Sequence, residues 1–126
     1  MDKIKVLVAD DLKLMRSLLR SSLTSFDCEI IAEVDNGAKV ADQVREFHPD
    51  IVFLDINMPG KNGLDVLQEI KEEFDDMFVA MVSGHNSFDN IRRSIELGAD
   101  GFVSKPYTAI KIREMIDKYR AGDDLD

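Results

Sequence analysis

Cysteine is almost absent from this 126-residue sequence, which contains only Cys28. A single cysteine excludes an internal disulfide and a cysteine-rich zinc site. Cys28 lies in a β-rich stretch, so we expect it to be a small apolar residue of a strand. The two histidines, His48 and His85, have no metal-ligand residues beside them, and we expect both at the surface.

Positive charge is also scarce. The 16 lysine and arginine residues are outnumbered by 25 aspartate and glutamate residues, which gives a net charge of -9 at pH 7. Nucleic-acid binding needs a basic surface, so we expect no nucleic-acid partner. No apolar stretch approaches the roughly 20 residues of a membrane span, and the N-terminus lacks the apolar region of a signal peptide. We therefore expect a cytoplasmic protein that does not bind membranes.

The sequence does contain a regular alternation of two hydrophobic periods. Short apolar runs typical of buried strands lie at 4–9, 28–34, 51–54, 77–82 and 101–104. Apolar residues recur at helical spacing within 15–26, 40–47, 63–74, 88–95 and 112–119. Five strands alternating with five helices predict an α/β fold, a (βα)5 chain with helices on both faces of one doubly wound parallel sheet. We expect a single domain at 1–121, followed by an acidic tail at 122–126.

Polar residues directly follow four of the predicted strands. Two strand orders are common in this fold class, and one of them is the flavodoxin-like order 2-1-3-4-5. In that order the first and third strands are neighbours at the switch point, so Asp10 and Asp11 lie beside Asp55. Ser83 and Lys105 reach the same edge, because each follows its own strand. Five polar residues would then converge on one crevice.

This set of side chains suits phosphoryl transfer. Three neighbouring carboxylates need a cation, and oxygen-only ligands favour a hard ion such as Mg²⁺. A carboxylate such as Asp55 can attack phosphorus and form an aspartyl phosphate, with Lys105 and Ser83 stabilising the transferred oxygens. Taken singly, each residue has a simpler explanation: Asp11 could cap a helix, Ser83 could be a turn residue and Lys105 a solvated lysine.

Four segments of the sequence resemble the receiver domain of bacterial two-component response regulators, over essentially the whole chain. They are Val8-Ala9-Asp10-Asp11, Asp55-Ile56-Asn57-Met58-Pro59 with Gly63, Val82-Ser83-Gly84, and Gly98-Ala99-Asp100-Gly101-Phe102-Val103-Ser104-Lys105-Pro106. Each segment alone is a weak signal, but their order and their places at strand ends are specific. The strand order 2-1-3-4-5 is itself typical of such receivers, so the order and the resemblance are not independent findings.

The resemblance implies a metal site and a phosphoacceptor. Asp55 would accept the phosphoryl group from a histidine kinase or phosphotransfer protein. Asp11, Asp55 and the backbone carbonyl of Asn57 would bind Mg²⁺, while Asp10 would hold the ion through water. Lys105 would pair with the phosphoryl oxygens.

The resemblance also implies a switch. Ser83 would donate to a phosphoryl oxygen and move inward, and Phe102 would turn inward with it, although Phe102 could simply be a core residue. The family's Lys-Pro bond is typically cis, so Lys105-Pro106 should be cis. Tyr107 stands where phenylalanine is more usual, a departure that we expect to touch no site role.

We expect a signalling switch rather than an enzyme, catalysing only its own phosphorylation and dephosphorylation. One helix follows Lys105-Pro106, so we expect no output domain. Signalling would then pass to a target protein or phosphatase through the fourth helix, last strand and fifth helix, where Arg92, Arg93, Lys111 and Arg113 lie. The unphosphorylated protein should be a monomer. Alternatively, the chain is a phosphate relay or sink, or a receiver excised from a longer regulator.

Two residues should set the lifetime of the phosphorylated state: Asn57 and His85, which lie two positions after Asp55 and Ser83. They would flank the approach of water to phosphorus. Two other protein classes fit less well. A phosphatase with an aspartyl-phosphate nucleophile usually has a second acid at the position of Asn57, and a flavin-binding protein would need a phosphate-binding loop where Asp10 and Asp11 stand.

Overall fold

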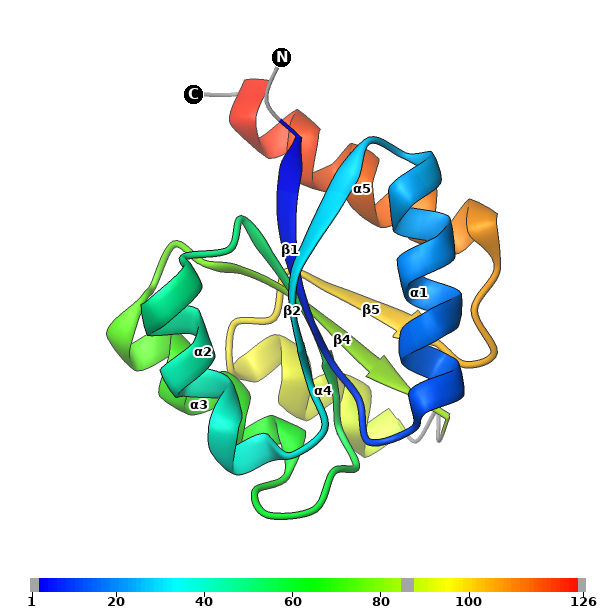
Figure 1. Cartoon of the computed structure of the whole chain (residues 1–126). Coiled ribbons are helices and arrows are strands. Elements are labelled where there is room, and N and C mark those ends of the chain that lie inside the picture. The colour runs from blue at the N-terminus through cyan, green and yellow to red at the C-terminus, as the bar shows by residue number, and fades with distance from the viewer. Residues whose placement is uncertain (1–2, 85–87, 125–126) are drawn as a thin grey trace.

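The structure, a computed structural model, describes residues 3–84 and 88–124. Strands and helices alternate along the chain (Figure 1), as the sequence predicts. The elements are β1 (Ile4–Ala9), α1 (Lys13–Ser25), β2 (Cys28–Val34), the 3-10 helix η1 (Gly37–Lys39), α2 (Val40–Phe47), β3 (Ile51–Asp55), α3 (Gly63–Glu73), β4 (Phe78–Ser83), α4 (Phe88–Glu96), β5 (Gly101–Ser104) and α5 (Ala109–Asp124).

The five strands form one parallel sheet in the order β2-β1-β3-β4-β5. This confirms the predicted order 2-1-3-4-5. At the centre, β1 pairs with β3 so that Ala9 lies opposite Leu54. The next residues, Asp10 and Asp55, therefore leave neighbouring strands at the same edge of the sheet. The register alone brings two of the predicted site residues together.

Helices cover both faces of the sheet (Figure 1), with α1 and α5 on one face and α2 and α3 on the other. Successive residues of β3 point to opposite faces, so Phe53 packs with α1 and α5 whereas Leu54 packs with α2 and α3. All five residues of β3 are buried. Because each fully buried large apolar side chain contributes roughly 1.5–3 kcal/mol, this strand anchors both core layers.

The fourth helix forms as predicted, but Phe88 and Ile95 of its apolar stripe do not face the core. Phe88 and Ile95 are 80% and 68% exposed, and the buried residue of α4 is Ser94, whose hydroxyl donates to the Asn90 carbonyl at 2.7 Å. A stripe within 88–95 and one within 90–97 have the same helical period. Periodicity alone therefore does not tell which side of the helix packs against the core. Two residues of other predicted stripes, Leu18 and Phe47, are also substantially exposed.

Two local predictions are confirmed. Cys28 is buried in β2, and the Lys105-Pro106 peptide bond is cis. Gly98, directly after α4 and Leu97, has a left-handed φ of 94°, and the Thr108 hydroxyl accepts from the Lys111 backbone N–H at 3.2 Å to cap α5. That helix continues to Asp124, beyond the expected start of the tail. In the described part of the chain, no helix has the length and hydropathy of a transmembrane segment.

Candidate functional site

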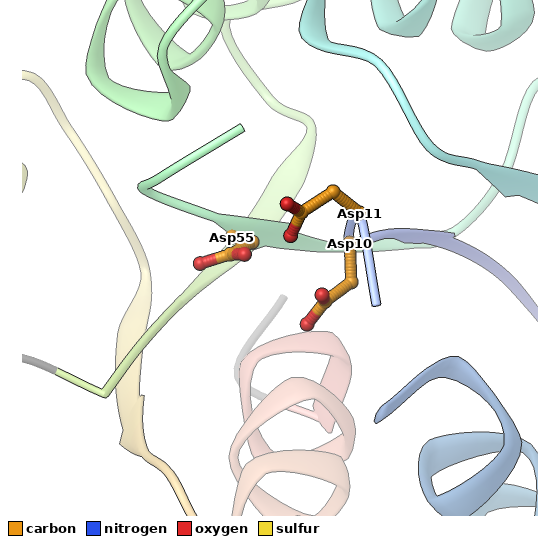
Figure 2. Close-up of side chains that lie close together, drawn as sticks. All are labelled: Asp10, Asp11 and Asp55. Carbon is orange, nitrogen blue, oxygen red and sulfur yellow. The ribbon is translucent and has the colours of Figure 1, made fainter. Parts of the chain in front are cut away.

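Three carboxylates meet where β1 and β3 end at the carboxyl edge of the sheet. Asp10, Asp11 and Asp55 each offer one oxygen, and these oxygens all lie within 4.8 Å of one another. Figure 2 shows the three side chains close together at the two strand ends. Asp10 and Asp55 are buried, with exposed fractions of 1% and 3%, whereas Asp11 is exposed at the rim. The predicted acidic cluster is therefore present in the fold.

Backbone hydrogen bonds and one glycine hold the loops that carry the acids. The Asp10 carboxylate accepts from the Leu12 backbone N–H at 2.9 Å, and the Asp55 carboxylate accepts from the Asn57 N–H at 3.3 Å. A Cβ at Gly63 would lie 2.2 Å from the Asp55 carbonyl oxygen, so only glycine allows α3 to begin this close to the strand end. The Gly63 of the sequence motif thus has a steric role.

Lys105 places its ammonium group between two of the carboxylates. Its Nζ lies 2.8 Å from Asp10 Oδ2 and 3.3 Å from Asp55 Oδ2, and its side chain is only 13% exposed. The Lys105 backbone N–H donates to the Ser83 carbonyl at 2.9 Å, which fixes the loop after β5 against the end of β4. One ammonium thus faces a cluster of three carboxylates.

The charges at the site are unbalanced. Burial raises the pKa of Asp55 to about 6; the charge of Asp10 adds to this rise, while Lys105 and the Asn57 N–H oppose it. Burial lowers the pKa of Lys105, but its hydrogen bond to Asp10 and the charge of Asp55 outweigh burial, so the net pKa is raised. Ionised carboxylates here would gain from a second cation. An all-oxygen donor set with surplus negative charge fits a hard divalent ion such as Mg²⁺.

The remaining predicted site residues occupy the same region with varied exposure. Ser83 is fully buried at the end of β4, directly after Val82, which pairs with Asp55. Asn57 is exposed in the loop after β3, and Phe102 is half-buried on β5, packed against the core layer of α2 and α3. His85 lies outside the described residues, so its expected effect on phosphate lifetime stays a prediction.

Two side chains contact Asp10 that the sequence analysis did not predict, Tyr107 and Arg16. The expectation that Tyr107 touches no site role is wrong, because its hydroxyl donates to Asp10 Oδ2 at 3.4 Å. The signal was a tyrosine two residues after Lys105, since a buried phenol usually needs a partner. Burial and the nearby charges of Asp10 and Asp55 raise the pKa of Tyr107.

The second contact is made by Arg16, whose guanidinium donates to the Asp10 carbonyl at 2.8 Å and pairs with Glu33 at 3.3 Å. No sequence motif predicted this contact.

Comparison with known proteins identifies the family. The model of the response regulator receiver domain matches residues 6–117. The chain belongs to the response regulator receiver family. It is 32% identical over 114 residues to the chemotaxis protein CheY of Bacillus subtilis, covering 90% of this chain and 95% of that protein. The chemotaxis protein CheY of Listeria monocytogenes is 33% identical, with 91% and 97% covered.

Solved receiver structures agree with the fold described above. The REC domain of AraT, a response regulator from Geobacillus stearothermophilus, has a TM-score of 0.87 at 26% identity, with 96% of this chain and 95% of that chain covered. A CheY-like receiver domain protein from Methanospirillum hungatei has a TM-score of 0.89 over both full chains at 20% identity. Phosphoryl acceptance is the general role of receiver domains, which generally bind Mg²⁺ at an acidic pocket.

Proposed function

We propose that this receiver is a phosphorylation-controlled signalling switch that accepts a phosphoryl group on Asp55 from a histidine kinase or phosphotransfer protein. The observation that carries the proposal is the juxtaposition of Asp10, Asp11, Asp55 and Lys105 at the carboxyl edge of a receiver fold. The chain is not an enzyme toward other substrates and catalyses only its own phosphorylation and dephosphorylation. It acts in the cytoplasm as a monomer until it is phosphorylated.

In the transfer step, an Asp55 carboxylate oxygen attacks phosphorus in line with the leaving nitrogen of the donor's phosphohistidine. The new O–P bond forms as the N–P bond breaks, and the electron pair stays on the imidazole nitrogen. Lys105 turns toward the transferred oxygens, which it can reach because its Nζ already lies 3.3 Å from Asp55 Oδ2. Ser83 donates a hydrogen bond to another phosphoryl oxygen, and Phe102 follows it inward.

The acidic residues would hold the metal ion that this reaction requires. Asp11, Asp55 and the Asn57 backbone carbonyl would be direct ligands, and Asp10 would act through water. Bound Mg²⁺ supplies positive charge that neutralises the phosphoryl oxygens as negative charge develops on them. Asn57 and His85 are the residues proposed to set how long the aspartyl phosphate survives.

The signal leaves through the face formed by α4, β5 and α5. This part of the proposal is supported by three exposed apolar side chains on α4 and α5: Phe88, Ile95 and Ile110, with exposed fractions of 80%, 68% and 70%. Arg92 and Arg113 on this face pair with acids of their own helices, at 3.4 Å with Asp89 and 4.0 Å with Asp117. An apolar face on a target protein or phosphatase is therefore the better match.

The stand-alone organisation is part of the same proposal, with a receiver at 1–121 whose last helix extends to Asp124, into the acidic segment at 122–126. It is supported by the two chemotaxis relatives, of which the chain covers 95% and 97%. The phosphate relay or sink remains the alternative, and a partner pull-down with and without beryllofluoride separates the two. Retention of a non-kinase partner by the activated form alone supports a switch with an output.

Labelling with acetyl phosphate tests the phosphoacceptor. Wild-type protein and Asp42→Asn, which alters an exposed carboxylate on α2, should both take up phosphate when Mg²⁺ is present. Asp55→Asn should take up none, because an amide oxygen is a poor nucleophile, and excess EDTA should prevent labelling of all three. Equal labelling of Asp55→Asn and wild type would overturn the proposal.

A further inference from the structure

Asp10 is a fully buried carboxylate whose oxygens are shared among several donors. Oδ1 accepts from the Leu12 backbone N–H at 2.9 Å. Oδ2 accepts from Lys105 Nζ at 2.8 Å and from the Tyr107 hydroxyl at 3.4 Å. Among the described residues, Tyr107 is the one uncharged side chain with a hydrogen bond to this carboxylate. Its ring packs against the core layer of α1 and α5, so its hydroxyl is held in place by packing.

Lys105 cannot serve all of its partners equally. Its Nζ contacts Asp10 Oδ2 more closely than Asp55 Oδ2, at 2.8 Å against 3.3 Å. A phosphoryl group on Asp55 would bring further anionic oxygens to the ammonium and draw it away from Asp10. The buried Asp10 carboxylate would then lose its closest partner, and an incompletely paired buried charge is costly.

We propose that Tyr107 is a positioning residue of the site, whose hydroxyl retains Asp10 Oδ2 when Lys105 turns from Asp10 to the phosphoryl group on Asp55. This inference rests on the proposed function. The hydroxyl holds the Asp10 carboxylate in the orientation that the metal site uses while the ammonium changes partner. Tyr107 therefore stabilises the phosphorylated arrangement more than the unphosphorylated one, in which Lys105 already holds Asp10.

Removing the Tyr107 hydroxyl should weaken the binding of a phosphoryl mimic while leaving the affinity for Mg²⁺ alone nearly unchanged. In Tyr107→Phe without a phosphoryl mimic, Lys105 still pairs with Asp10, so the affinity for Mg²⁺ alone should change less than about twofold. With beryllofluoride as the phosphoryl mimic at saturating Mg²⁺, the missing hydrogen bond should weaken binding of the mimic by roughly three- to tenfold. This is the range of an ordinary hydrogen bond rather than of one to a charged group, because the contact is long.

The chain offers a matched control in its only other tyrosine, Tyr119. Tyr119→Phe removes the same atom from a ring that packs edge-on against Phe78, with centroids 5.5 Å apart. This ring lines a groove with Lys3 and Ile4 at the opposite edge of the sheet.

The same control variant also allows a fluorescence measurement. The chain has no tryptophan, so Tyr107 is the only tyrosine or tryptophan left to fluoresce in Tyr119→Phe. Its emission should fall on beryllofluoride binding as the phenol donates more strongly to the carboxylate.

The experiment is a calorimetric titration of Mg²⁺, then of beryllofluoride, into wild type, Tyr107→Phe and Tyr119→Phe, with melting curves of each. Selective loss of beryllofluoride affinity in Tyr107→Phe supports the inference. Wild-type affinities in Tyr107→Phe overturn it, and so does a parallel loss of both affinities with a lowered melting temperature, which indicates a structural role. If wild type and Tyr119→Phe also fail to bind beryllofluoride, the proposed function itself fails.

Discussion

At the scale of single residues, Asp55 illustrates the conflict that defines the site. Its carboxylate is 3% exposed and lies beside Asp10, and both conditions disfavour the ionised form. The pKa of Asp55 is accordingly raised from 3.8 to about 6. A nucleophile must nevertheless be ionised to attack phosphorus. Ionising Asp55 at neutral pH therefore costs free energy, and a bound cation would reduce that cost.

This conflict predicts that Asp55→Asn stabilises the metal-free protein. A folded-state pKa above the unfolded value contributes stability that is fully present below pH 3.8 and is lost as the pH rises through about 6. At pH 7 in EDTA, Asp55→Asn should therefore have a free energy of unfolding about 2 kcal/mol above wild type. Urea denaturation at pH 4.5 and 7 measures this. An unchanged difference between the two pH values, or a less stable variant at pH 7, would contradict the assignment.

The two acids after β1 should differ in how much they contribute to Mg²⁺ binding. Asp11 is exposed, and its side chain has no hydrogen bond within residues 3–84 and 88–124, whereas Asp10 already serves Leu12, Lys105 and Tyr107. Asp11 is thus the freer ligand, and Asp11→Asn should lose more affinity for Mg²⁺ than Asp10→Asn, by about tenfold. Isothermal titration of both variants tests this, and equal losses would mean that the ligand assignment is wrong.

At the scale of elements, apolar side chains of β3 form the core, whereas those of α4 lie largely at the surface. Phe53 on β3 is fully buried in the core layer of α1 and α5, whereas Phe88 on α4 is 80% exposed. The sequence presents both as members of regular apolar patterns. Burial distinguishes a residue that holds the fold from one that is available to a partner.

Alanine substitutions should separate these roles. Phe53→Ala should lower the free energy of unfolding by about 3–5 kcal/mol, because it removes buried contacts and leaves a cavity. Phe88→Ala should change it by about 0.5 kcal/mol or less, since the side chain is mostly in water. Chemical denaturation of the two variants provides the comparison. A large loss of stability in Phe88→Ala would show that this side chain is packed in solution. It would then not be available to a partner at the proposed output face.

At the scale of the whole molecule, the strand order connects Asp55 with the output face proposed above, which is formed by α4, β5 and α5. The order β2-β1-β3-β4-β5 places the end of β4, with Ser83, between Asp55 and the strand that carries Phe102. A change at the phosphoacceptor can therefore spread through β4 and β5 to α4 and α5 without passing through α2.

Beryllofluoride activation should therefore change backbone chemical shifts mainly within residues 83–119. The second helix, α2, which contacts β2 and α3 near the opposite end of the strand order, serves as an internal reference. Two-dimensional NMR spectra with and without beryllofluoride at constant Mg²⁺ provide the measurement. Changes confined to α1 and α2 would place the output elsewhere.

Much of this organisation could be predicted from the sequence, because it depends on local patterns. The buried run of β3, the glycine after α4 and the polar residues at strand ends all have signatures a few residues long. The packed side of α4 could not be predicted, since the stripes through Phe88 and Ser94 have the same period. Tyr107 was missed for a different reason: its contact with Asp10 spans 97 residues and depends on the path of the loop after β5.

The central claim is that Asp55 carries the phosphoryl group, and chemical mapping of the modified residue tests it most directly. Borohydride reduces an aspartyl phosphate to homoserine, so the protein is treated with acetyl phosphate and Mg²⁺, reduced, digested with trypsin and sequenced by mass spectrometry. The peptide 46–61 contains both Asp50 and Asp55, so Asp50 is a control within the same fragment. Homoserine at 55 alone is the predicted result. Homoserine at 50, 10 or 11, with Asp55 intact, would contradict the account.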